Sequence, residues 1–176
     1  MAFVAPRPRD AVDHIAEQWD EVRPDLDSSP LLVVGRISRL SRLIDRRLAE
    51  SFERFDLEAW MYDVLATLRR SGEPYELTAG ELVRQSMVTT GAITNRIDRL
   101  EARGLVERRR TTDRRKVIVG LTAAGLALVD EVVGPHLDTE TEILAPLSDR
   151  QRRDLANLLR PLLLGLGDRP EGPDGP

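Results

Sequence analysis

The sequence contains no cysteine and only two histidines, His14 and His136, which lie far apart along the chain. Without cysteine the chain can form neither disulfides nor thiolate metal sites, and it cannot sense oxidants through a thiol. Two isolated histidines do not make a metal site or a histidine-centred catalytic relay. We find no nucleophile paired with a histidine and no Gly-rich phosphate loop. We therefore expect a protein that is not an enzyme, with no catalytic residues, no metal and no cofactor.

Long apolar runs are also absent. No stretch approaches the roughly 18 apolar residues of a membrane span, and the first ten residues, MAFVAPRPRD, lack the apolar core of a signal peptide. Aromatic residues make up only 4% of the chain, but hydrophobic residues make up 41%, which is enough to build a core. We expect a cytoplasmic protein without a membrane partner.

The chain as a whole has no excess of positive charge, but one of its segments does. The net charge is −4 and the pI is about 5.3, which alone argues against a nucleic-acid binder. Residues 89–116, however, contain nine basic and four acidic side chains, against 17 and 26 elsewhere. The distribution of charge matters more than its total for attracting a polyanion, although a solvated charged surface would give the same count.

Helical periodicity dominates the chain from residue 10 onward. We expect a disordered N-terminus over 1–9, N-terminal helices over 10–55, and terminal helices over 122–166 that are followed by a disordered tail over 167–176. Ser29 is expected to cap the second N-terminal helix, with Pro30 at its first position. Pro135 is expected to kink the helix that starts near Thr122, and Ser148 to Gln151 are expected to form the capping box of the last helix.

The segment 56–121 has the pattern of a winged helix-turn-helix. Asp56 is expected to cap a first helix, Thr78 to Glu81 form a capping box for a second, and Gly104 stops a third that begins near Thr89. Two short helices joined by a tight turn form a helix-turn-helix. Residues 105–110 and 116–121 alternate as two strands of a wing. The predicted fold is mainly α with a small two- to three-stranded β-wing, flanked by N- and C-terminal dimerisation helices.

The third helix has the composition of a DNA-reading helix. Ile93, Ile97 and Leu100 fall on one side, which must face the core. Small and polar side chains that suit a major groove gather at the start of the helix and on its other side, namely Thr89, Thr90, Gly91, Thr94, Asn95 and Arg99. An ordinary polar helix surface is the alternative.

The wing carries a second group of candidate DNA contacts. An arginine at a hairpin tip can enter a narrow minor groove, and a neighbouring aspartate can orient it through a charge-assisted hydrogen bond. The candidates are Arg110, Asp113, Arg114 and Arg115. A tip that is merely solvated would look the same.

The run from Leu57 to Gly125 resembles the MarR family of winged helix-turn-helix transcriptional regulators. The resemblance is carried by DVLATL at 63–68, TNRIDRLE at 94–101, GLVER at 104–108, DRR at 113–115 and LTAAG at 121–125. It implies a homodimer that binds a palindromic operator in double-stranded DNA, with its recognition helices spaced about one turn apart.

A finer resemblance is to the urate-responsive branch of this family, the HucR and PecS type. It implies that Trp19, Asp63, Arg96 and Arg108 bind a small anionic effector. On the helical wheel Arg96 lies on the flank of the buried side, where it can touch a ligand inside the protein. An arginine fork suits a planar anion and tryptophan can stack on one. The alternative is that Arg96 and Asp63 form a structural ion pair and Trp19 is a hydrophobic anchor.

Together these patterns predict a sequence-specific DNA-binding regulator, a repressor that an anionic effector such as urate releases from its operator. A regulator that responds to a phenolic or aromatic-carboxylate compound, or that has no ligand, is the alternative. A purely helical protein-interaction module is disfavoured, because a wing with an arginine tip would serve no purpose in it.

Overall fold

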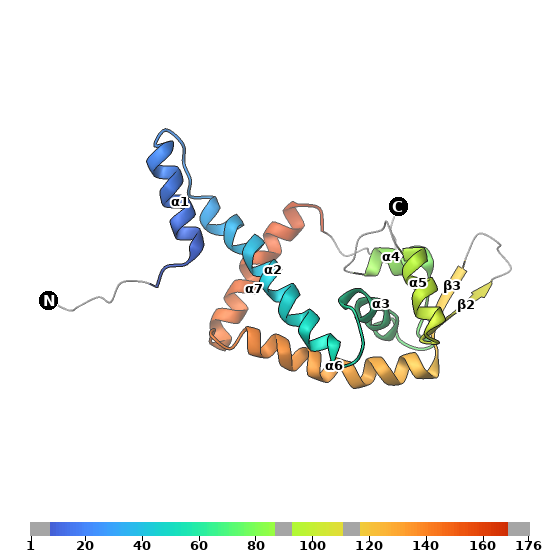
Figure 1. Cartoon of the computed structure of the whole chain (residues 1–176). Coiled ribbons are helices and arrows are strands. Elements are labelled where there is room, and N and C mark those ends of the chain that lie inside the picture. The colour runs from blue at the N-terminus through green and yellow to red at the C-terminus, as the bar shows by residue number, and fades with distance from the viewer. Residues whose placement is uncertain (1–7, 87–92, 111–116, 169–176) are drawn as a thin grey trace. The chain divides into compact units, whose positions relative to one another are not determined.

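The structure is a computed structural model, and it describes residues 8–86, 93–110 and 117–168 (Figure 1). The chain divides into two compact units, Met1–Ala59 and Trp60–Pro176. Each unit is described by itself below. None of the helices within the described ranges is long and apolar enough to cross a membrane.

The first unit contains α1 (Ala11–Val22) and α2 (Leu31–Glu53). Asp10 caps α1, in a capping box with Asp13. Arg36 of α2 reaches both carboxylates, at 2.8 Å from Asp10 and 2.6 Å from Asp13. The pKa of Asp10 is lowered chiefly by the Arg36 guanidinium, and that of Asp13 by the backbone N–H of Asp10 and then by Arg36. One arginine therefore fastens α1 to α2.

Two predicted helix starts are wrong. Ser29 does not cap α2, because its hydroxyl and N–H both hydrogen-bond the carboxylate of Asp27, and the helix begins after Pro30 without a side-chain cap. Asp56 does not cap the next helix either. It has a left-handed φ of 52°, and the N–H of Leu57 bonds back to the carbonyl of Phe52. Asp56 thus ends α2 in the manner of a C-terminal cap.

The second unit holds the predicted helix-turn-helix. Its helices are α3 (Ala59–Arg70), α4 (Ala79–Gln85) and α5 (Ile93–Ala102). Thr78 forms the expected capping box with Glu81, and Gly104 has the positive φ of 69° that the predicted helix stop requires. Leucines from all three helices, Leu65, Leu68, Leu82 and Leu100, are completely buried. This core fixes how α5 is presented.

A three-stranded antiparallel sheet follows, in the order β1–β3–β2, from β1 (Glu76–Thr78), β2 (Val106–Arg110) and β3 (Val117–Leu121). In the hairpin, Val106 pairs with Leu121 and Arg110 with Val117. The short β1 adds to the other edge of β3. The predicted fold, mainly helical with a small β-wing, is confirmed.

The C-terminal part consists of α6 (Ala123–Ile143) and α7 (Asp149–Gly165), and each helix continues through an internal proline. Ser148 and Gln151 form the predicted capping box of α7. Between α3 and α6, Arg69 bonds Asp130 at 2.7 Å, and the rings of Tyr62 and His136 lie 4.5 Å apart. These contacts tie α6 to the helix-turn-helix.

Candidate DNA-binding and effector site

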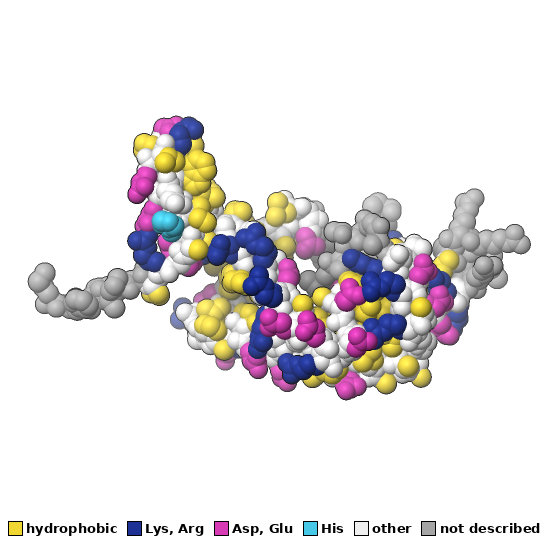
Figure 2. Space-filling model, in the orientation of Figure 1, with side chains coloured by type: hydrophobic (Ala, Val, Ile, Leu, Met, Phe, Trp, Pro, Cys, Tyr) yellow, Lys and Arg dark blue, Asp and Glu magenta, His cyan; other side chains and the backbone are white. Residues whose placement is uncertain are grey.

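Helix α5 presents a polar face because its apolar side chains are buried. Ile97 and Leu100 are 2% and 0% exposed, whereas Thr94, Asn95 and Arg99 are all exposed. Figure 2 shows basic and acidic side chains next to one another in the region where Figure 1 places α4 and α5. These three predicted DNA-reading side chains therefore share an accessible helix surface.

The remaining predicted DNA contacts cannot be placed in the same way. Arg110 is the last residue of β2, at the point where the hairpin leaves the sheet. The predicted recognition-helix residues Thr89, Thr90 and Gly91 and the predicted wing-tip residues Asp113, Arg114 and Arg115 lie outside the described residues.

Arg108, which was predicted to bind an effector, holds α5 from the neighbouring strand. Its Nη1 lies 2.6 Å from Glu101 and its Nη2 lies 2.5 Å from Asp98. Nη2 also donates to the backbone carbonyl of Thr94 at 3.2 Å. The side chain is only 26% exposed. Charge-assisted contacts to two carboxylates of one helix fix the position of α5 against β2.

Trp60 is the residue of this region that sequence reasoning missed. The guanidinium carbon of Arg99 lies 4.8 Å from the centre of the indole ring, and that of Arg96 lies 5.6 Å from it. Both distances are within cation–π range. The sequence contains one signal that could have identified Trp60. It lies three residues before the candidate effector residue Asp63, and this spacing places both on one side of α3.

Arg96 lies on the flank of α5, as the helical wheel predicted, and is half-buried. Its Nη1 is buried and donates no hydrogen bond to any described residue. A buried guanidinium nitrogen without an acceptor costs roughly 1–3 kcal/mol. The side chain is thus prepared to bind an acceptor.

Asp63 is half-buried on α3, one turn after Trp60. Its backbone carbonyl accepts the hydroxyl of Thr67 at 2.7 Å, so the helix is well ordered at this point. Arg96, Asp63 and Arg108 all belong to the second unit, and the ring of Trp60 stands between α3 and α5.

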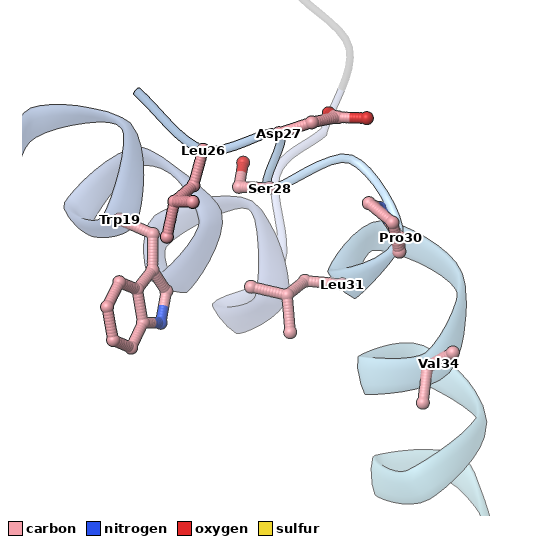
Figure 3. A pocket seen from close by; sticks show the side chains of 7 residues that line it. All are labelled: Trp19, Leu26, Asp27, Ser28, Pro30, Leu31 and Val34. Atoms are coloured by element: carbon pink, nitrogen blue, oxygen red, sulfur yellow. The ribbon is translucent and has the colours of Figure 1, made fainter. Parts of the chain in front are cut away.

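Trp19 belongs to the first unit, where it lines a pocket of about 460 Å³ between α1 and the start of α2. Figure 3 shows its indole, Leu26 and Leu31 directed toward the same space. The other lining residues are Asp27, Ser28, Pro30 and Val34. The walls are mainly apolar, and the indole is 48% exposed. Trp19 thus offers a stacking surface in an apolar setting.

A metal centre is not indicated by this part of the protein. Within the described ranges, no group of three or more histidine, cysteine, aspartate or glutamate side chains could hold a metal ion. Among the polar groups of the region, the arginines, the hydroxyls and the amide suit recognition of nucleic acid and of small anions.

Comparison with known proteins agrees with this geometry. Residues 55–116 match the model of the MarR family. The chain is 43% identical over 149 residues to the HTH-type transcriptional regulator PecS of Dickeya dadantii, covering 84% of this chain and 90% of PecS.

Solved structures with the same fold include two of particular interest. A mutant of MarR from E. coli complexed with operator DNA aligns with a TM-score of 0.68 and 29% identity, over 82% of this chain and 97% of that one. Bordetella bronchiseptica BpsR, whose DNA binding is regulated by 6-hydroxynicotinic acid, aligns with a TM-score of 0.67 and 27% identity, over 74% and 91%.

Proposed function

Because the chain belongs to the MarR family of DNA-binding transcriptional regulators, and within it to the PecS type, we propose that it is an effector-controlled repressor. In this proposal a homodimer binds a palindromic operator and a small anionic effector such as urate releases it.

DNA reading is assigned to the exposed face of α5. Thr94 and Asn95 reach base edges in the major groove, and Arg99 binds guanine or phosphate. Thr89, Thr90 and Gly91, which lie outside the described residues, are proposed DNA contacts as well. The wing residues Arg110, Asp113, Arg114 and Arg115 bind the adjacent minor groove. The relative with operator DNA bound supports this placement.

The effector proposal depends on one observation, the buried Nη1 of Arg96 that has no acceptor among the described residues. A carboxylate or urate oxygen would satisfy it, and a planar anion matches the guanidinium fork. Asp63 and Arg108 belong to the same unit as Arg96, whereas Trp19, the fourth proposed effector residue, belongs to the first unit. The regulation of BpsR by 6-hydroxynicotinic acid makes an aromatic carboxylate the second candidate.

Release follows from the position of Arg96 on the recognition helix itself. An effector that binds Arg96 more tightly when α5 is displaced favours a dimer whose two helices no longer match the operator. To move the population from almost fully bound to almost fully released, the two affinities must differ by about 10⁴-fold.

Dimerisation is assigned to the terminal helices because they expose many large apolar side chains. On α7, Leu158 is 69% exposed, Leu162 48% and Leu163 50%. On α2, Val33 and Val34 are 54% and 63% exposed. Apolar surface of this extent marks a protein–protein contact.

A gel-shift titration tests the proposal, with the DNA upstream of the chain's own gene and its divergent neighbour, at fixed salt. Specific binding that urate reverses is the expected result. Arg96→Gln should still bind but no longer respond, whereas Arg103→Gln, the same change at the end of the same helix, should respond normally. Reversal by 6-hydroxynicotinate or salicylate instead of urate selects the second candidate. Absence of specific binding would refute the regulator role.

A further inference from the structure

One aromatic ring serves two arginines whose proposed roles differ. Arg99 is assigned to DNA and Arg96 to the effector, yet both guanidiniums lie within 6 Å of the centre of the Trp60 ring, at 4.8 and 5.6 Å. Trp60 comes from α3, whereas both arginines come from α5. The ring is half-buried at the start of its helix, so it is held by the scaffold and the arginines rest against it.

The charge distribution explains why this ring matters. Arg96 and Arg99 are three residues apart on one helix, a spacing at which like charges repel. The two acidic residues nearest to them on α5, Asp98 and Glu101, bind Arg108 from β2. The negative face of the indole offsets part of this repulsion.

We propose that Trp60 is a positioning residue that couples the effector-binding arginine to the DNA-binding arginine. This inference rests on the function proposed above for Arg96 and Arg99. With no effector, the ring fixes the direction of Arg99, so that less side-chain freedom is lost when it meets the operator. When an anion draws Arg96 from the ring, the contact of Arg99 with the same ring changes as well.

A double-mutant cycle on operator affinity tests the coupling. Exposed cation–π contacts correspond to about a two- to fivefold change in an equilibrium constant. Trp60→Leu should therefore weaken operator binding about two- to fivefold, and Arg99→Gln should cost correspondingly less in the Trp60→Leu background. Arg96→Gln should alter operator affinity when Trp60 is present and leave it unchanged when Trp60 has been replaced by leucine. Trp60→Phe keeps an aromatic face and should retain most of the affinity.

Asn95 provides the matched control, because it is an exposed side chain of the same helix that is also assigned to DNA, whereas the cation–π contacts of Trp60 are to Arg96 and Arg99. The effects of Trp60→Leu and Asn95→Ala should multiply independently. A second readout covers the case in which the Trp60→Leu substitution impairs folding. In a Trp19→Phe background Trp60 is the only tryptophan, and its emission should shift on Arg96→Gln and on Arg99→Gln but not on Arg153→Gln, the same change on α7.

The outcomes separate this inference from the function on which it rests. If the unaltered protein binds its operator but the Trp60 and Arg99 effects are independent, the coupling is refuted and the regulator stands. An unmoved Trp60 emission in both glutamine variants refutes it equally. If the unaltered protein binds no operator, both proposals fall together.

Discussion

Gly125 lies where the first turn of α6 meets the junction of α5 and β2, and we predict that it cannot be replaced by alanine. A Cβ built on it would lie 1.9 Å from the carbonyl oxygen of Leu105 and 2.9 Å from the carbonyl carbon. Both atoms belong to the backbone, so a rotamer change cannot relieve the clash. Since real Cβ contacts essentially never fall below 3.0 Å, the two segments would have to separate by about 1.1 Å.

The cost of that separation can be worked from the contacts it breaks. The N–H of Thr122 donates to the carbonyl of Leu105 at 3.1 Å, and the hydroxyl of Thr122 donates to the carbonyl of Gly104 at 2.7 Å. Each contributes about 1 kcal/mol, and forced overpacking adds about 1–3 kcal/mol. Gly125→Ala should therefore lower the free energy of unfolding by about 3 kcal/mol or more, which corresponds to roughly 10 °C in Tm.

Urea unfolding followed by circular dichroism, at one fixed protein concentration, measures this change. Gly165→Ala is the matched control, since a Cβ at that position of α7 meets no atom within 4 Å among the described residues beyond its chain neighbours and its own helix backbone. The control should stay within about 0.5 kcal/mol of the unaltered protein. A Gly125→Ala variant that is equally stable would show that the close approach to Leu105 is not a feature of the folded protein.

Three further predictions follow from the ion pairs and exposed surfaces. Arg108→Gln removes the contacts to Asp98 and Glu101, so it should lower the free energy of unfolding by about 1 kcal/mol, as measured by calorimetry. It should also weaken operator binding in a gel shift, and intact affinity would contradict the role of Arg108 in holding α5. The pKa values of Asp10 and Asp13 are lowered in the folded protein. Their attraction to Arg36 therefore stabilises the fold fully at a pH above the aspartate pKa of the unfolded chain, about 3.9. This stabilisation is lost as the pH falls through the lowered pKa values of the folded protein. In a Trp60→Phe variant, Trp19 emission should thus report loosening of α1 only below about pH 4, whereas a transition centred above pH 5 would exclude these carboxylates. Leu158→Glu should give a monomer in analytical ultracentrifugation while Arg153→Glu on the same helix remains a dimer, and an unchanged Leu158→Glu dimer would place the interface elsewhere.

The order of the helices and the two-stranded wing could be predicted from the sequence because their signals are local. The Thr78–Glu81 and Ser148–Gln151 capping boxes and the left-handed Gly104 all lie where the pattern indicated. Asp56 shows the limit of such signals. An aspartate suits both the start of a helix and the left-handed position after one, and only the bond from Leu57 back to Phe52 decides between them.

The contacts between elements could not be predicted in this way. A helical wheel places Arg96 on the flank of the buried face, but it cannot say that Trp60 of another helix lies against it. The same holds for Arg108, whose partners Asp98 and Glu101 are reached across the turn from α5 to β2. The strand β1 was predicted only as a third strand without a position, because Glu76–Thr78 is too short to show alternation and forms by pairing with β3.

The backbone bonds around Thr122 leave the recognition helix with one fixed end. Its C-terminal end continues into Gly104 and Leu105, whose carbonyls are both bound by Thr122 at the start of α6. If the contacts of Arg108 to Thr94, Asp98 and Glu101 are released, α5 can rotate about this fixed end. The ten residues of α5 span about 15 Å. A tilt of about 10° would thus carry the far end about 2.6 Å, close to the length of one hydrogen bond. Small rotations near Gly104 would accordingly be amplified at the end of α5 that is proposed to meet the bases.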